Sequence, residues 1–220
     1  GGGMAVQEAV SKRWKQVTGR HIIQGYGLTE TSPSAVVVPI DTEEFDGSTG
    51  LPISSTEVRI CDDDGNDVAR GGVGEICIRG PQVMEGYWQK PEETELVMLP
   101  GGWFRTGDIG RMDERGYVFI EDRKKDMILV SGFNVYPNEI ESVVVSMNGV
   151  LEAAAIGKPD EKSGEVVKLF VVRSDPSVTE KDILAFCRAN LTGYKVPREI
   201  EFRDQLPKTN VGKILRRALR

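Results

Sequence analysis

The sequence has few of the residues that most often build metal and disulfide sites. Histidine occurs once, at His21, which excludes a site made of several histidines and a conventional Ser-His triad within this chain. The cysteines are odd in number and widely spaced, so no pair has zinc-site or redox-motif spacing. We expect His21 to be structural, and we expect small core residues in a reducing compartment at Cys61, Cys77 and Cys187.

Long hydrophobic runs and excess positive charge are also absent. No apolar run approaches the roughly 20 residues of a membrane-spanning helix, and we find no secretory signal segment. The 28 lysines and arginines are outnumbered by 34 aspartates and glutamates, a net charge of −6 that argues against a nucleic-acid partner. With 39% hydrophobic and 28% charged residues in 220 positions, the composition predicts one or two globular domains, and we expect them in the cytoplasm.

The hydrophobic pattern changes twice along the chain. Residues 4–17 have apolar side chains at helical spacing, and a Gly-rich turn and a strand follow, as in part of an α/β layer. Between about 50 and 122, short strands alternate with Asp- and Gly-rich turns, which predicts a β-rich subdomain. The expected strands are 57–61, 74–79 and 117–121. One turn, 62–67, lacks the ligand spacing of a calcium loop.

After Lys125 the pattern indicates a mixed α and β region. Residues 137–147 have helical periodicity, and Asn148-Gly149 is a typical helix stop. Two apolar runs, 153–157 and 166–172, read as buried strands. Thr179 and Asp182 resemble a capping box at the start of a further helix.

Residues 25–30, Gly-Tyr-Gly-Leu-Thr-Glu, are the first candidate ligand site. Their glycines allow close backbone approach to a ligand, and the free N–H groups of a turn suit a phosphate. Tyr26 offers a flat face for a base, and Glu30 can hold Mg²⁺ through one oxygen. The alternative is an ordinary loop around a buried tyrosine.

A second candidate pairs Asp108 with Arg123. Asp108 follows a glycine turn in Trp-Phe-Arg-Thr-Gly-Asp, and its carboxylate can accept hydrogen bonds from both hydroxyls of a ribose. Arg123 closes the next expected strand and can share the same ribose. The alternatives are an Asx turn or helix cap for Asp108 and a solvated strand end for Arg123.

A third candidate is Lys213, which follows Gly212 near the end of a loop. The loop lacks the earlier glycine of a Walker motif. Lysine is a compact positive charge suited to a transferring phosphoryl group. The alternative is a solvated basic helix, because no acidic residue lies in 207–220.

The order of these motifs resembles that of the adenylate-forming superfamily, which includes acyl-CoA ligases, luciferases and peptide-synthetase adenylation domains. The matching motifs are Tyr-Gly-x-Thr-Glu at 26–30, Gly-Glu-Ile at 74–76, Arg-Thr-Gly-Asp at 105–108, Asp-Arg-Lys-Lys-Asp at 122–126 and Pro-Lys-x-x-x-Gly-Lys at 207–213. Residues 101–125 are most similar to the signature of bacterial long-chain fatty-acid–CoA ligases. Three positions depart from that signature, with Arg105 for His, Met112 for Trp and Glu114 for Pro.

The resemblance implies a fold that combines α/β and α+β parts. Residues 1–124 would be the C-terminal part of a large N-terminal AMP-binding domain, with the β-rich subdomain at about 50–122. Residues 125–220 would be the small C-terminal α+β domain. The family's Ser/Thr/Gly-rich phosphate loop occurs nowhere in the sequence, and the chain opens Gly-Gly-Gly-Met. We therefore expect the C-terminal part of a longer enzyme, inactive when alone.

The resemblance also implies a nucleotide site. Its residues would be Gly2, Gly3, Met4, Tyr26, Gly27, Thr29, Asp108 and Arg123. In the family's pattern the first three end a strip along the adenine, and Tyr26 stacks on the base. Thr29 contacts the α-phosphate, Glu30 holds Mg²⁺, and Asp108 and Arg123 bind the ribose.

Three more residues receive roles in the same way. Lys213 would bridge the substrate carboxylate and the α-phosphate, Gly132 would border the channel for CoA, and Lys125 would be the hinge between the two domains. The implied reaction joins a fatty acid to ATP as acyl-AMP and then to CoA as a thioester. An adenylating enzyme without CoA transfer and a non-catalytic nucleotide-binding module are the alternatives. Peripheral contact with the inner membrane face and a homodimer stay open.

Overall fold

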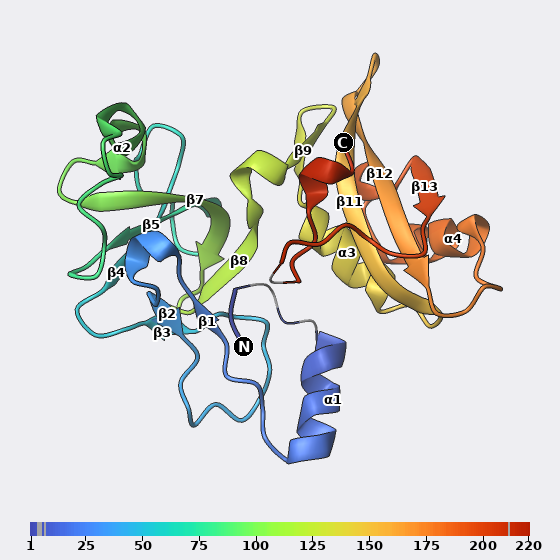
Figure 1. The fold of residues 1–220 in the computed structure, drawn as a ribbon, viewed down its shortest axis with the longest axis horizontal. Coiled ribbons are helices and arrows are strands. Elements are labelled where there is room, and N and C mark those ends of the chain that lie inside the picture. Colours follow the sequence, from blue (N-terminus) through green and yellow to red (C-terminus); the bar gives the residue numbers. More distant parts are fainter. Residues whose placement is uncertain (4–5, 7, 211) are drawn as a thin grey trace. The chain divides into compact units, whose positions relative to one another are not determined.

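The computed structural model describes residues 1–3, 6, 8–210 and 212–220. The chain divides into two compact units, unit 1 from Gly1 to Lys124 and unit 2 from Lys125 to Arg220. Helices and strands of both are labelled in Figure 1. Within the described ranges, no helix combines the length and apolar character that crossing a bilayer requires.

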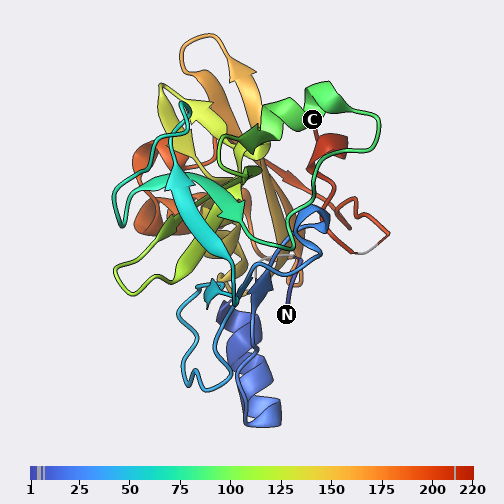
Figure 2. The ribbon, with the colours of Figure 1, turned by 90° about the vertical axis from the view of Figure 1, so that its left-hand side faces the viewer.

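Unit 1 begins with a helix and a small antiparallel sheet. Helix α1 spans Glu8–Thr18, and Figure 2 shows that it extends away from the strands of its unit. The sheet has the order β1-β2-β3, with strands Gly25–Tyr26, Val36–Val37 and Leu51–Pro52. A 3-10 turn, η1, covers Thr29–Thr31. The helix and strand content expected for this part is confirmed, and every strand pair in the sheet is antiparallel.

The β-rich pattern expected for the rest of unit 1 is confirmed as a five-stranded antiparallel sheet. Its order is β4-β5-β7-β6, and β8 pairs with β7. The strands are β4 Glu57–Cys61, β5 Val73–Arg79, β6 Met98–Leu99, β7 Trp103–Met112 and β8 Val118–Arg123. A short helix that the sequence analysis did not predict, α2 at Pro91–Val97, begins with proline in its first turn. Tyr26 and Val36 pack with Ile76, Ile78 and Val118 in the core.

Unit 2 is an α+β structure, as expected. Its sheet has the order β10-β9-β12-β11, and β13 pairs in parallel with β12. The strands are β9 Ile128–Val130, β10 Phe133–Val135, β11 Val150–Asp160, β12 Gly164–Arg173 and β13 Glu199–Phe202. The helices are α3 Pro137–Val145 and α4 Glu180–Asn190, with 3-10 turns η3 Gly193–Lys195 and η4 Arg216–Ala218. A further 3-10 turn, η2 Lys124–Asp126, includes the last residue of unit 1 and the first two of unit 2. The capping box between Thr179 and Asp182 is confirmed.

Strand β12 is buried on both faces. Val167, Leu169 and Val171 pack with apolar residues of α3 and α4. The alternate residues Phe170 and Val172 pack instead with the C-terminal segment, through Leu206, Ile214 and Leu219. Because successive strand residues point to opposite faces, β12 reads in sequence as a nearly continuous apolar run. The segment that carries Lys213 therefore covers the face of the sheet opposite the helices.

The cysteines lie in the core, as the sequence analysis expected. The three cysteines are buried and free. Both ring nitrogens of His21 are buried without a hydrogen-bond partner among the described residues. Across the described ranges, no group of three or more His, Cys, Asp or Glu side chains is arranged to hold a metal ion.

Candidate functional site

Three of the expected nucleotide residues come together in unit 1. The Tyr26 hydroxyl donates a hydrogen bond of 2.7 Å to Oδ2 of Asp108, and Arg123 Nε lies 3.8 Å from the other carboxylate oxygen. The register of β7 and β8 places Asp108 directly opposite Arg123. Tyr26 comes from the separate sheet of β1. Tyr26 and Arg123, from two different sheets, thus both contact the Asp108 carboxylate.

The expectation that Asp108 follows a turn is wrong, because Asp108 lies inside the ten-residue strand β7. A bulge sits at this point. Glu75 and Cys77 on β5 pair with Ile109 and Arg105, so one residue of β5 faces three residues of β7. Gly107 has φ +71°, a left-handed conformation that glycine adopts without strain. Bulges re-aim side chains next to functional sites, and this one turns Asp108 towards Tyr26.

The surroundings of Tyr26 differ from the open face that its sequence context indicated. Only 8% of the residue is exposed, since the ring packs in the core of unit 1. This burial, reinforced by the negative charge of Asp108, raises the pKa of Tyr26 well above its usual value. A Cβ atom on the neighbouring Gly27 would lie 1.7 Å from the carbonyl oxygen of Pro33. Glycine is thus required at position 27 because its backbone packs closely against the backbone of Pro33.

Gly2 and Gly3 lie at the start of the same sheet. Gly2 forms an isolated parallel bridge with Gly25, and the Gly25 N–H donates to the carbonyl of Gly1 at 2.9 Å. Gly3 has φ +83°. Met4, the third residue expected in this strip, lies outside the described residues. The two described glycines therefore run beside the strand that carries Tyr26.

Thr29 and Glu30 belong to the turn η1 that follows β1. Thr29 is exposed. The Glu30 carboxylate accepts a hydrogen bond of 2.9 Å from the Tyr87 hydroxyl through Oε1, and the Glu30 carbonyl accepts the Met84 N–H at 2.8 Å. The second carboxylate oxygen has no hydrogen bond to any described residue. One free carboxylate oxygen fits Mg²⁺, which is commonly held by one or two carboxylates together with substrate phosphates.

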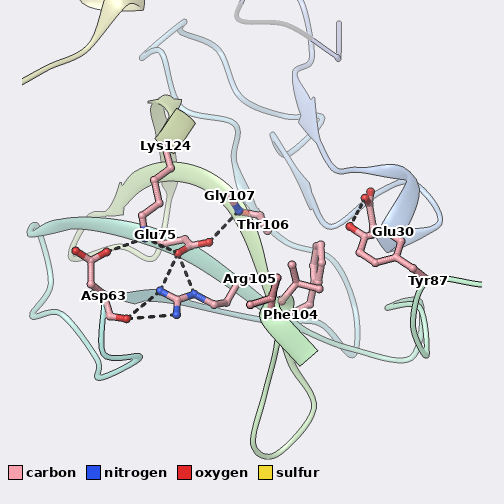
Figure 3. Close-up of a pocket in the computed structure, with 11 residues that line it drawn as sticks. Glu30, Asp63, Glu75, Tyr87, Phe104, Arg105, Thr106, Gly107 and Lys124 are labelled. Carbon is pink, nitrogen blue, oxygen red and sulfur yellow. Dashed lines mark hydrogen bonds and ion pairs between the residues drawn. The ribbon is translucent and has the colours of Figure 1, made fainter. Parts of the chain in front are cut away.

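A hollow of about 390 Å³ next to these residues contains a buried carboxylate that the sequence analysis did not assign (Figure 3). Glu75, 5% exposed, accepts hydrogen bonds from Arg105 Nε at 3.0 Å and Lys124 Nζ at 3.3 Å through Oε2. Its Oε1 accepts the N–H of Gly107 at 3.0 Å. Glu75 thus fixes the bulge immediately before Asp108. Its signal in the sequence was an acidic residue within the apolar strand 74–79.

The charged run 122–126 divides between the two units. Lys124 Nζ pairs with Asp63 at 2.7 Å as well as with Glu75, and the hydrogen bond to Asp63 raises the pKa of Lys124. Asp126 pairs with Arg220 at 3.2 Å in unit 2. Lys125, between them, is exposed and its side chain forms no ion pair with any described residue. Each charged neighbour of Lys125 is thus anchored within its own unit.

Lys213 stands beside a turn at the tip of a loop in unit 2. Gly212 has φ +81°, and the backbone N–H of Lys213 donates to Thr209 Oγ1 at 3.1 Å. An isolated bridge between Lys208 and Ile214 closes the base of the loop. The side chain of Lys213 is partly exposed and pairs with no acidic residue in the described part of the chain.

The basic residues around Lys213 are not a solvated helix, so that alternative is wrong. Arg216 pairs with Glu141, Arg220 with Asp126 and Lys208 with Glu152. These partners lie far away in sequence, which is why the stretch 207–220 looked unpaired. Helix formation is limited to the short turn η4.

Gly132 forms the tip of the β9–β10 hairpin. Ser131 with φ +51° and Gly132 with φ +83° make a two-residue turn in which both residues are left-handed. A Cβ atom at Gly132 would have no heavy atom within 4 Å. The turn therefore requires glycine for its backbone conformation, and the space above it is open.

Two family models match the chain. The model described as AMP-binding enzyme matches residues 1–88, and the model described as AMP-binding enzyme C-terminal domain matches residues 139–213. The chain belongs to the family of AMP-binding enzymes.

Named relatives match along the whole chain. It is 59% identical to a long-chain-fatty-acid–CoA ligase of Escherichia coli O157:H7 and 61% identical to one of Yersinia pestis, and both alignments cover all of this chain and 39% of the relative. A crystal structure of ATP-bound MatB from Rhodopseudomonas palustris superposes with a TM-score of 0.95 at 37% identity, over the whole of this chain and 44% of that one. The chain therefore spans well under half the length of the relatives it matches.

Proposed function

We propose that this chain is the C-terminal part of a long-chain fatty-acid–CoA ligase, which forms acyl-AMP from a fatty acid and ATP and then transfers the acyl group to CoA. The observation that carries the proposal is 59–61% identity, along the entire chain, to two proteins named for that activity. The proposed domains are the end of a large AMP-binding domain at 1–124 and the small C-terminal domain at 125–220. The boundary between the two compact units supports this division.

In the proposed nucleotide site, Asp108 and Arg123 bind the ribose hydroxyls. The Tyr26 hydroxyl and the bulge held by Glu75 orient the Asp108 carboxylate, so that this acceptor is in place before the nucleotide arrives. Tyr26 and the strip of Gly2, Gly3 and Met4 border the adenine, with Gly27 closing the turn. Holding these groups rigid lowers the entropy lost on binding.

Thr29 and Glu30 face the phosphates in this proposal. Thr29, exposed on η1, contacts the α-phosphate, and the free oxygen of Glu30 holds Mg²⁺ while Tyr87 fixes the other oxygen. The metal ion supplies charge neutralisation and orientation of the phosphates. The protein's part is to fix one carboxylate oxygen at the start of the turn.

Lys213 is the proposed catalytic residue of the first step. A fatty-acid carboxylate attacks the α-phosphorus of ATP, and pyrophosphate leaves with the bonding electron pair. Both reactants are anions and repel each other. An ammonium group between them lowers that repulsion and stabilises the charge of the transition state. Lys213 is suited to this role because its ammonium group is not already paired with a carboxylate of the described residues.

The second step breaks the acyl–phosphate bond. The CoA thiol, losing its proton, attacks the acyl carbonyl carbon, and AMP leaves. We propose that Gly132 borders the CoA channel, where the absence of a side chain leaves room for a narrow substrate. We propose Lys125 as the hinge that changes the domain pose between the two steps, because the side chains of its neighbours are anchored in ion pairs while its own side chain is not.

Finer features of the proposal rest on composition. We propose a cytoplasmic location, which the free cysteines support, and peripheral contact with the inner membrane face, which would bring the enzyme to its fatty acids. A homodimer stays open. Since the sequence lacks the family's phosphate loop, we expect the 220-residue chain alone not to catalyse fatty-acid-dependent ATP–pyrophosphate exchange.

The test uses the full-length protein that carries this chain. Fatty-acid-dependent ATP–pyrophosphate exchange and CoA-dependent thioester formation are both expected. Acyl-AMP formation without thioester formation would favour an adenylating enzyme that does not use CoA. Nucleotide binding without either half-reaction would favour a non-catalytic module.

A further inference from the structure

A largely buried guanidinium group ties the segment that carries Lys213 to helix α3 of unit 2. Arg216, three residues after Lys213, has 16% of its side chain exposed. Its Nη2 lies 2.7 Å from Glu141 Oε2, and its Nε donates to Oε1 of the same carboxylate at 3.1 Å. This is the two-pronged geometry that arginine forms with a carboxylate and lysine does not.

Glu141 is itself held by the sheet. Its side chain, on α3, is 9% exposed, and Oε1 accepts the N–H of Ala155 on the edge strand β11 at 2.9 Å. Arg216 also donates to the side-chain oxygen of Asn138, one turn earlier on α3, at 2.8 Å. The turn η4, which contains Arg216, contacts β11. The C-terminal segment is thus tied to the edge of the sheet and to α3 together.

The same guanidinium reaches the residue that follows Lys125. Arg216 Nη1 lies 3.7 Å from Asp126 Oδ2, and Arg220 donates to Asp126 Oδ1 and to the Lys125 carbonyl, both at 3.2 Å. Asp126 is 13% exposed. Two arginines from the C-terminal turn therefore hold both the backbone and the side chain at the first residues of unit 2.

We propose that Arg216 is a positioning residue that fixes Lys213 relative to the start of unit 2, so that a rotation at Lys125 carries Lys213 with it. The inference rests on the proposed function, in which Lys213 acts in adenylation and Lys125 is the hinge. The loop of Lys213 is otherwise held by backbone bonds at its base, by the ion pair between Lys208 and Glu152 on β11, and by apolar packing on the sheet through Leu206, Ile214 and Leu219. Those contacts hold the segment against the face of the sheet, whereas the two-pronged bond of Arg216 fixes where the segment lies along that face, next to α3.

The role predicts a selective kinetic defect. Arg216→Lys keeps the positive charge but cannot form the two-pronged hydrogen bond with Glu141. A displacement of about 1 Å at a catalytic group can cost about 10²-fold in rate. In the full-length protein we expect the kcat of ATP–pyrophosphate exchange to fall by about that factor with little change in the KM for ATP, while thioester formation from supplied acyl-AMP, which does not use Lys213, stays within about 2-fold.

The neighbouring Arg217 provides a matched control, since its side chain is exposed and has no ion pair in the described part of the chain. Arg217→Lys should leave both half-reactions unchanged. Glu141→Gln keeps an acceptor for the Ala155 N–H but removes the charge that Arg216 grips, and should reproduce the Arg216→Lys defect. Amide hydrogen exchange of residues 208–219 in the chain should be faster in Arg216→Lys than in Arg217→Lys.

Each outcome decides the inference. Equal losses in both half-reactions would assign Arg216 a purely structural role and overturn the inference. If Arg216→Lys behaves as Arg217→Lys does in an active enzyme, the positioning role fails and the proposed function stands. If the unmodified full-length protein forms no acyl-AMP, the proposed function fails and the inference fails with it, whatever the amides show.

Discussion

In each unit of the molecule, a buried glutamate accepts hydrogen bonds from an arginine side chain and from a backbone N–H group. In unit 1, Glu75 binds Arg105 and the N–H of Gly107, and in unit 2, Glu141 binds Arg216 and the N–H of Ala155. Both networks end beside Lys125, the first through Lys124 and the second through Asp126. Neither network includes the side chain of Lys125.

The two networks differ in what they join. Glu75 and Arg105 lie on neighbouring strands of one sheet, 30 residues apart, and their bond tightens a local bulge. Glu141 and Arg216 are 75 residues apart and join a helix to the end of the chain. In the proposed function, the buried charge of unit 1 therefore shapes the nucleotide site, whereas that of unit 2 holds the segment that carries Lys213. The charged run 122–126 is the place where one network stops and the other begins.

The largest expected effect comes from removing the Lys213 side chain, which pairs with no acidic residue in the described part of the chain. In the full-length protein, Lys213→Ala should lower acyl-AMP formation by about 10²–10³-fold, the usual cost of losing one focused charge in a reacting site. Thioester formation from supplied acyl-AMP should change far less. Half-reaction kinetics measure both rates.

The control for Lys213 lies in the same loop. Lys208 already pairs with Glu152, so Lys208→Ala should leave acyl-AMP formation within a few-fold of the unmodified rate. Equal losses of both half-reactions in Lys213→Ala would contradict the assigned role and point to a general structural defect.

A second prediction tests the residue that neither network holds. Lys125→Pro fixes φ near −65° and should oppose rotation at this position. In the full-length protein one half-reaction should collapse while the other persists, and which one persists identifies the frozen pose. Lys125→Ala removes the charge without fixing φ and should retain both. If Lys125→Pro kept both rates near those of the unmodified enzyme, 122–126 would be no more than a solvated turn.

The third prediction compares a buried with an exposed ion pair in unit 1. Glu75→Ala leaves Arg105 and Lys124 without their buried acceptor and should lower the free energy of unfolding of the chain by about 3 kcal/mol, as breaking one side of a buried pair does. Glu57→Ala also breaks an arginine pair, but that pair is largely exposed, so this variant should lose far less stability than Glu75→Ala. Urea unfolding of the two variants measures the difference. Similar losses in the free energy of unfolding would mean that burying the Glu75 ion pairs does not add to their contribution to stability.

Several elements of this fold are local enough to be predicted from the sequence. The strand 57–61 has its predicted bounds because alternating side chains end at an Asp- and Gly-rich turn. The Thr179 capping box was visible because both partners lie within one turn. The mutual proximity of Tyr26, Asp108 and Arg123 followed from a family resemblance, since no local pattern connects residues so far apart.

What the sequence could not predict depends on long-range pairing. The bulge at Gly107 arises from the register between β5 and β7, which no single strand specifies. The partners of Arg216 and Arg220 lie in other elements, so the C-terminal charges looked solvated. Helix α2 was missed because its seven residues are too few for a periodic pattern.

The smallest expected effect separates the two units by their response to alkaline pH. Burial raises the pKa of Tyr26 in unit 1, with a further contribution from Asp108, and burial alone raises the pKa of Cys187 in unit 2 to about 11. Both groups are neutral when protonated, and their pKa values are higher in the folded than in the unfolded chain. Their contribution to stability is therefore complete below the unfolded values of about 10 for Tyr and 8.5 for Cys, and it is lost as the pH rises through the folded values.

Asp108→Asn distinguishes these two causes. Removing the carboxylate should shift the titration of Tyr26 to lower pH, because a nearby negative charge no longer opposes formation of the tyrosinate. The titration of Cys187 should not move, since its shift has no charged partner. Tyrosinate and thiolate absorbance, each compared with the Tyr26→Phe and Cys187→Ala variants, report the two groups separately. An unchanged Tyr26 titration in Asp108→Asn would mean that Asp108 does not act on Tyr26 through its charge, and the bond that defines the unit 1 site would then have to be reassigned.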